Sequence, residues 1–185
     1  MNKIIFINQE SGPLMIDIVN RFSNSNLNTI LYTGKIIETY SKLNSNVKVR
    51  HLCVYKKHNN FARLFTWTIF SLQTFFFMMV DLRKKSKIYF SSNPPFIYFL
   101  MFFFKNKFFI HVYDVYPDAL LAFPQINHSS FVYKSFVFFN KKIFPSAEKI
   151  FTPSESMKNM LEKYTDNNKI KVVSWWADTN FIKPI

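Results

Sequence analysis

The chain has 185 residues, a formal net charge of +13 and one cysteine, Cys53. This length suits one well-buried domain and is short for two, and a lone cysteine excludes an internal disulfide and fits a reducing compartment. The basic charge favours an anionic partner, namely nucleic acid, an anionic lipid surface or a phosphorylated substrate, although a solvated basic surface would give the same count.

The chain begins with a short apolar run, Ile4–Ile7. Four apolar residues are fewer than the roughly 7–15 in the hydrophobic region of a signal peptide. A continuous apolar run is typical of a strand that is covered on both faces. We therefore expect a first buried strand and a cytoplasmic N-terminus.

Short β-rich runs alternate with longer helical segments along the whole chain. The expected strands are Lys3–Asn8, Asn28–Thr33, Val47–Cys53, Lys87–Phe90, Lys107–Val112, Lys149–Thr152 and Ile170–Ser174. The expected helices are Leu14–Ser23, Phe61–Arg83, Phe96–Phe104, Ser130–Phe144 and Glu155–Tyr164, the last with Ser154 as its N-cap. This alternation predicts an α/β fold, a Rossmann-like parallel sheet with helices on both faces.

The segment Leu64–Leu82 is long enough to cross a bilayer, but it contains several polar residues. Helical spacing predicts a core-facing stripe through Phe61, Leu64, Phe65, Ile69, Leu72, Phe76 and Met79. It leaves apolar residues on the opposite face, followed at once by a basic cluster. The predicted membrane-contact residues are Trp67, Phe70, Phe77, Arg83, Lys84 and Lys85. Contact in the plane of an anionic membrane is the favoured interpretation; ordinary core or domain packing and a true span are the alternatives.

Polar residues follow the expected strands at their carboxyl ends, where open parallel sheets bind ligands. After the first strand come Ser11 and Gly12, next to a helix N-terminus suited to a phosphate, although a plain turn fits equally. Asn93 follows the fourth strand. Tyr113, Asp114, Tyr116 and Asp118 follow the fifth. We expect a carboxylate here to contact a substrate hydroxyl or accept its proton; the alternative is that either aspartate only caps the following helix.

Several functions lack support in the sequence. The four histidines and Cys53 have no metal-ligand spacing, and there is no phosphate-binding glycine motif or catalytic triad order. We therefore predict no metal site and no cofactor. The aromatic residues occur in apolar blocks and are not interleaved with Lys and Arg, which disfavours nucleic-acid binding.

Five short segments together resemble a known enzyme family: Ile4-Ile5-Phe6-Ile7-Asn8-Gln9, Ser92-Asn93-Pro94-Pro95, Tyr113-Asp114-Val115-Tyr116-Pro117-Asp118, Phe151-Thr152-Pro153-Ser154 with Met157-Lys158, and Lys171–Asp178 leading to Phe181 and Pro184. Their order and spacing are similar to those of the bacterial GT-B glycosyltransferases of retaining family four, which build capsule, O-antigen and other lipid-linked glycans. The resemblance implies two Rossmann-like halves, with a polyprenyl-diphosphate-linked acceptor in the N-terminal half and the nucleotide sugar in the C-terminal half. It implies no metal, and it gives Asp114 a role in acceptor contact or proton handling, with Asn93, Tyr113 and Tyr116 lining the cleft.

The resemblance also sets the expected domain boundaries. Residues 1–174 would form the acceptor-binding domain, and residues 175–185 would start the crossover to a donor-binding domain that lies outside this sequence or on another chain. We therefore expect a chain that lies peripherally on the inner face of the cell membrane and does not transfer sugar alone. The alternative is a non-catalytic subunit that docks on the membrane and recruits a separate donor-binding chain. Only Gly12 stands where the family usually has adjacent glycines.

Overall fold

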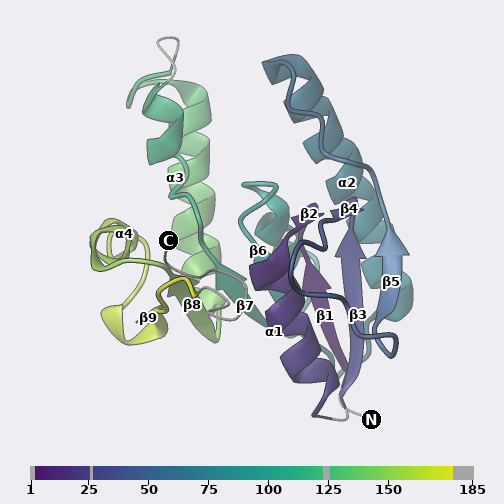
Figure 1. Ribbon diagram of the computed structural model, residues 1–185. Helices are drawn as coiled ribbons and strands as arrows, with labels where there is room; N and C mark the ends of the chain where they lie inside the picture. The colour runs from purple at the N-terminus through teal and green to yellow at the C-terminus, as the bar shows by residue number, and fades with distance from the viewer. Residues whose placement is uncertain (1–2, 26, 123–125, 177–185) are drawn as a thin grey trace, which may run out of the picture. The chain divides into compact units, whose positions relative to one another are not determined.

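The computed structural model describes residues 3–25, 27–122 and 126–176, and it divides into two compact units. Unit 1 comprises residues 1–89 with 175–185, and unit 2 comprises residues 90–174. The elements of unit 1 are β1 (Lys3–Ile7), β2 (Glu10–Ser11), α1 (Pro13–Ser23), β3 (Asn28–Thr33), β4 (Lys35–Ile36), β5 (Lys48–His51), α2 (Asn60–Asp81) and the first part of β6 (Lys87–Ser91) (Figure 1). Of the expected crossover segment, Trp176 donates a hydrogen bond to Asp17 of α1, at 3.0 Å, and residues 177–185 lie outside the described residues.

The predicted parallel sheet is confirmed, with the strand order β5-β3-β1-β6-β7-β8-β9 and β6 shared by the two units. All seven expected strands are present. The sequence did not predict the short parallel pair β2 and β4, in which Glu10 lies opposite Lys35. This pair stands directly beyond the ends of β1 and β3, so it shapes the loop that contains Gly12.

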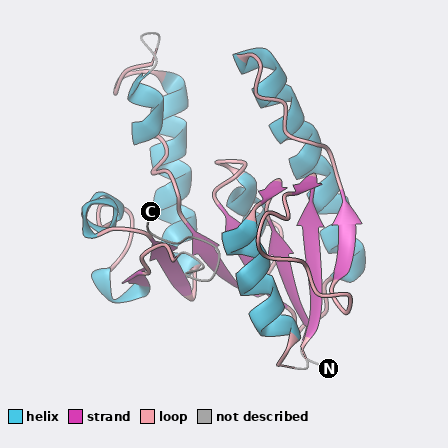
Figure 2. Ribbon diagram, viewed as in Figure 1, coloured by secondary structure: helices cyan, strands magenta, loops and turns pink. Residues whose placement is uncertain are grey.

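Unit 1 has a helix on each face of its strands (Figures 1 and 2). Phe6 of β1 lies beside Leu31 of β3 in the parallel register, and its ring contacts Phe22 of α1, with ring centroids 5.4 Å apart. Tyr32 is the next residue after Leu31, so it faces the other way, and it contacts Phe77 and Asp81 of α2. The strands are therefore covered on both sides, as the continuous apolar run Ile4–Ile7 predicted.

The predicted orientation of α2 is wrong. The face toward the sheet consists of Thr66, Phe70, Ser71, Thr74, Met78 and Asp81, which are all buried. Six of the seven residues of the predicted inner stripe instead face outward, and the seventh, Ile69, is half-buried. Phe61, Leu64, Phe65, Leu72, Phe76 and Met79, together with Val80, are 51–79% exposed. We call these seven residues the outer face of α2. Four of the six inner residues are polar: the hydroxyls of Thr66 and Ser71 donate to carbonyls of α2 itself, and the Asp81 carboxylate accepts from side chains of β3 and β5.

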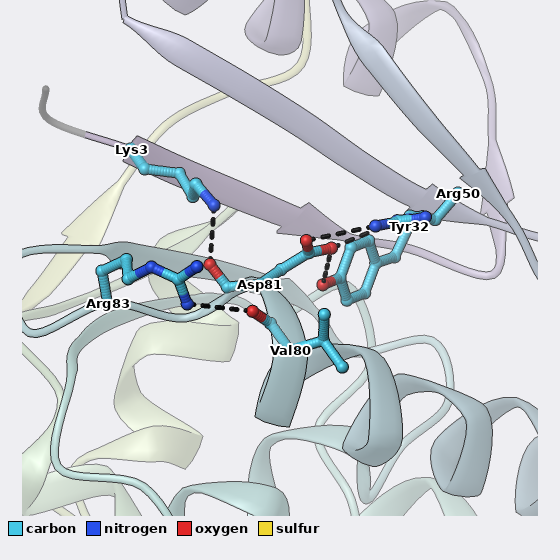
Figure 3. A network of polar contacts seen from close by, with 6 residues as sticks. All are labelled: Lys3, Tyr32, Arg50, Val80, Asp81 and Arg83. Carbon is cyan, nitrogen blue, oxygen red and sulfur yellow. Dashed lines mark hydrogen bonds and ion pairs between the residues drawn. The ribbon is translucent and has the colours of Figure 1, made fainter.

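A buried ion pair fixes the C-terminal end of α2 (Figure 3). Arg50 of β5 donates to both carboxylate oxygens of Asp81 at 3.2 Å, and the Tyr32 hydroxyl donates to the same carboxylate at 2.8 Å. Lys3 of β1 donates to the Asp81 backbone carbonyl at 2.7 Å. Burial alone raises the pKa of the Asp81 carboxyl, but hydrogen bonds from Arg50 and Tyr32 outweigh it, so this pKa lies below its ordinary value.

Two glutamines fix the N-terminal half and the middle of the same helix. The Gln9 side chain, fully buried after β1, donates to the carbonyl oxygens of Cys53 and Thr66 at 3.1 and 3.0 Å. Gln73 of α2 accepts from the backbone N–H of Cys53 at 2.7 Å. Gly34 permits this approach, because a Cβ there would lie 2.4 Å from the Cys53 carbonyl oxygen. Both halves of α2 are therefore held by polar contacts.

Unit 2 continues the sheet from β6 through β7 (Lys107–His111), β8 (Lys149–Thr152) and β9 (Ile170–Val172). Its helices are α3 (Phe131–Ile143) and α4 (Glu155–Leu161), with short 3₁₀ segments η1 (Ile97–Phe102), η2 (Asp118–Ala122), η3 (Phe144–Ser146) and η4 (Asn167–Lys169). The predicted N-cap of α4 is confirmed, since Ser154 accepts from the backbone N–H of Met157. The segment expected as a helix at Phe96–Phe104 forms η1.

We predict that Asp81→Ala lowers the free energy of unfolding by on the order of 3 kcal/mol, because it leaves Arg50 and the Tyr32 hydroxyl without their acceptor. Urea unfolding followed by circular dichroism would measure this loss. Glu155→Ala is the matched control. It also breaks an ion pair, with Lys158, but the Glu155 side chain is 72% exposed, so the pair contributes little to stability. An equal, small effect of both substitutions would contradict the structural importance of Asp81.

Candidate functional site

In unit 2, the loops after β6 and β7 lie side by side and contain most of the predicted site residues. The Ser92 backbone N–H donates to the His111 carbonyl at 2.9 Å, and its hydroxyl accepts from the Tyr113 backbone N–H at 3.0 Å. Ser92 thereby joins the loop that contains Asn93 to the loop that begins at Tyr113. From the sequence, both loops were expected at the carboxyl ends of the strands, but nothing in it indicated that Ser92 links them.

Asp114 lies exposed on the loop after β7. Within the part of the chain that the structure describes, no group hydrogen-bonds or ion-pairs with its carboxylate, which remains available to a ligand. The neighbouring Tyr113 stacks on His111, with ring centroids 4.3 Å apart, and burial raises its pKa to about 12. At neutral pH the Tyr113 phenol therefore keeps its proton, and it stands next in sequence to the exposed Asp114 carboxylate, a group that accepts hydrogen bonds from sugar hydroxyls.

Asp118 is used within unit 2. Its carboxylate accepts from the Tyr133 hydroxyl at 3.2 Å and pairs with Lys163 at 2.5 Å, and it is only 16% exposed. These contacts tie η2 to α3 and to the segment after α4. They argue for a structural role and against the predicted substrate contact, because a ligand would have to displace one of the two partners.

The loop with Tyr116 is anchored from α3 by a residue that the sequence analysis missed. Asn140, fully buried, donates to the Tyr116 carbonyl at 2.7 Å and accepts from the Tyr98 hydroxyl at 3.2 Å. Asn140 lies two helical turns after Tyr133, which also faces inward. The sequence did contain a signal for this role: Asn140 is a polar amide seven residues after Tyr133, on the side of the helix that is otherwise apolar and buried.

The two predicted residues in unit 1 differ from each other. The Ser11 hydroxyl is buried and lies 3.0 Å from the Thr33 hydroxyl, so it holds its loop and is not offered to a ligand. Gly12 is the N-cap of α1, and a Cβ added there would meet nothing within 4 Å. The chain itself therefore gives no steric reason for glycine at this position.

The predicted membrane-contact residues divide between the inner side of α2 and its basic end. Phe70 is fully buried, so its assignment to membrane contact is wrong. Trp67 is half-buried and stacks on Tyr55, and Phe77 is half-buried beneath the Arg50 guanidinium, which lies 4.9 Å from its ring centroid. The basic residues Arg83, Lys84 and Lys85 are exposed.

Of the helices in the described residues, α2 alone has the length and composition to cross a membrane, and a third of its most apolar window is buried. Core helices of soluble proteins meet the same criteria, so this finding alone does not show a span. No three His, Cys, Asp or Glu side chains within residues 3–25, 27–122 and 126–176 are grouped so that they would hold a metal ion.

Comparison of the whole chain with solved structures identifies the fold. Sucrose-phosphate synthase from Thermosynechococcus elongatus matches all of this chain with a TM-score of 0.65 and 9% identity. WaaG, a glycosyltransferase involved in lipopolysaccharide biosynthesis, matches 91% of it with a TM-score of 0.55 and 11% identity. The fold is that of the GT-B glycosyltransferases.

The chain spans about half the length of these two structures, 51% and 44% respectively. No protein-family model and no curated protein sequence matches it. The GT-B fold expected from the short motifs is therefore confirmed by structure, at identities that carry no information on substrate.

His111 predicts a pH dependence of stability. Burial lowers its pKa to about 4, from an ordinary value of 6.5. Between these values the unfolded chain binds the proton and the folded chain does not, so stability rises with pH across this window and is lost as the pH falls, by up to about 3 kcal/mol. We expect His111→Gln to flatten this dependence in urea unfolding between pH 7 and pH 4. The exposed His128, substituted as His128→Gln, is the control; parallel curves for wild type and His111→Gln would refute the assignment.

Proposed function

We propose that this chain is the acceptor-binding, membrane-associated half of a glycosyltransferase. It would take part in moving a sugar from a nucleotide sugar to a glycan acceptor carried on polyprenyl diphosphate, in the synthesis of surface polysaccharides such as capsule or O-antigen. The nucleotide sugar would be bound mainly by a C-terminal domain or a partner chain. The GT-B fold supports sugar transfer in general, and the resemblance of the short sequence motifs supports the polysaccharide context.

The observation that carries the proposal is the exposed outer face of α2. Seven large apolar side chains lie along one side of this helix, and the exposed cations Arg83, Lys84, Lys85 and Lys87 follow it directly. Soluble domains rarely expose so continuous an apolar surface without a partner. An apolar face bordered by Lys and Arg is typical of a helix that lies in the plane of an anionic membrane.

The inner face of α2 favours contact in the plane of the membrane over a span. Asp81, Thr66 and Thr74 are buried against the rest of unit 1, and Phe70 and Met78 are fully covered. A helix that is tied to strands along one side can present only its other side to lipid. This orientation fits a peripheral protein on the inner face of the cell membrane.

Asp114 is the candidate catalytic or acceptor-contact residue. Its carboxylate is exposed and unpaired within the described residues, at the sheet edge where α/β folds bind ligands. Hydroxyl groups of an acceptor sugar are suitable donors to it. Asn93, Tyr113 and Tyr116 would contact the same sugar from the two loops that Ser92 joins.

We predict that Phe65→Ser combined with Phe76→Ser weakens binding to anionic vesicles by roughly 30-fold, because about 2 kcal/mol of apolar burial in the membrane is lost. Sedimentation with vesicles of phosphatidylcholine and phosphatidylglycerol measures this binding. Val54→Ser is the control, since Val54 is 48% exposed in the loop before α2. Unchanged binding of a folded double variant would refute the outer face as the membrane contact.

Acceptor binding is tested with a polyprenyl-diphosphate-linked monosaccharide that has a short prenyl chain. We expect saturable binding that Asp114→Asn weakens about tenfold, because a neutral amide oxygen is a weaker hydrogen-bond acceptor than a charged carboxylate. Asp166→Asn, an exposed carboxylate elsewhere in unit 2, is the control. Membrane binding without any acceptor binding would instead support the non-catalytic docking subunit.

A further inference from the structure

A second exposed apolar surface lies in unit 2, where η1 meets α3. Phe102 and Phe103 of the η1 end and Phe131, Phe138 and Phe139 of α3 are 37–85% exposed. We call these five residues the η1–α3 surface. The ring of Phe139 lies 5.7 Å from Phe102 and 5.5 Å from Phe138, so these three side chains form one continuous aromatic area across the two segments.

We propose that the η1–α3 surface is a second membrane-binding element, which inserts its phenylalanines into an anionic lipid surface. The proposal rests on the proposed membrane-associated function but concerns different residues, in the other structural unit. It also deepens that function, because the inner side of the same helix holds the candidate site loop.

The charge pattern favours lipid over protein as the occupant. Within unit 2, residues 90–113 and 119–147 contain five lysines and not one Asp or Glu. Lys105, Lys134, Lys141 and Lys142 are exposed on the segments that carry the surface, and the Lys142 ammonium lies 5.9 Å from the Phe138 ring centroid. Lysine is depleted in protein–protein interfaces, whereas lysines beside exposed aromatics attract anionic headgroups.

The inner side of α3 gives the docking a consequence for the site. Asn140 holds the Tyr116 carbonyl and Tyr133 holds Asp118, at 2.7 and 3.2 Å. Asn140 is buried and lies between the exposed Phe139 and Lys141 in sequence. One turn of α3 therefore has residues for lipid contact on its outer side and a residue that holds the loop on its inner side. Insertion of the outer side would therefore hold the loop with Asp114 one helix diameter, roughly 10 Å, from the lipid, within reach of the sugar of a lipid-linked acceptor.

The test uses an environment-sensitive fluorophore attached to one cysteine at a time in the 185-residue chain carrying Cys53→Ser. We expect Phe138→Cys to give a blue-shifted emission with phosphatidylglycerol-containing vesicles, and Ser156→Cys, exposed on α4, to give none. Lys141→Gln and Lys142→Gln should each weaken binding to these vesicles roughly fivefold and leave binding to phosphatidylcholine alone unchanged, since each basic residue near the surface contributes about 1 kcal/mol.

A third probe separates this proposal from the proposed function. Phe76→Cys reports on the outer face of α2. A shift at position 76 with none at position 138 would overturn the η1–α3 surface as a lipid contact and leave membrane association intact. An unchanged emission at both positions would overturn both proposals. A shift at position 138 that appears without vesicles and grows with protein concentration would assign the surface to a second copy of the chain, and so refute lipid as its occupant.

Discussion

The ion pair between Asp81 and Arg50 determines which side of α2 faces water. Asp81 is the last residue of the helix, where a negative charge opposes the helix dipole, so its position is favourable only because Arg50, Tyr32 and Lys3 surround it. Together with the Gln9 contact at the N-terminal half and the Gln73 contact near the middle, this pair allows α2 one rotation about its axis. In that rotation the more apolar side is exposed, so the polar contacts of unit 1 create the surface on which the proposed function depends.

The sequence predicted the elements of this fold well and the orientation of α2 incorrectly, for one physical reason. Strands and helices follow from local patterns, and all seven expected strands formed. The rotation of α2 depends on partners far away in the chain: Thr66 meets Gln9, 57 residues earlier, and Asp81 meets Tyr32, 49 residues earlier. The rule that the apolar side of a helix packs inward fails when the sheet provides buried polar partners for the other side. It also fails when the outer side contacts an apolar environment such as a membrane.

The candidate site shows the same division between local and distant information. Asp114 and Asp118 are the same residue type in the same loop, and position alone gave them similar roles. Tyr133 and Lys163, which lie 15 and 45 residues after Asp118, occupy its carboxylate and leave Asp114 as the exposed one. Likewise, Ser11 was predicted from its place after β1, but Thr33 of the neighbouring strand engages its hydroxyl. The ends of the strands can be located from sequence. Which polar side chains at those ends lack a partner within the fold cannot.

Both units expose aromatic or aliphatic side chains on a helix whose inner side is held by buried polar contacts. Such surfaces would favour aggregation in a neutral protein, and a net charge of +13 opposes it because the chains repel one another. The same charge is attracted to anionic lipid, where the apolar side chains are removed from water. The excess of lysine thus makes the exposed phenylalanines tolerable. The positive charge keeps the free chains apart in solution, and it attracts the apolar surfaces to anionic lipid, where they are removed from water.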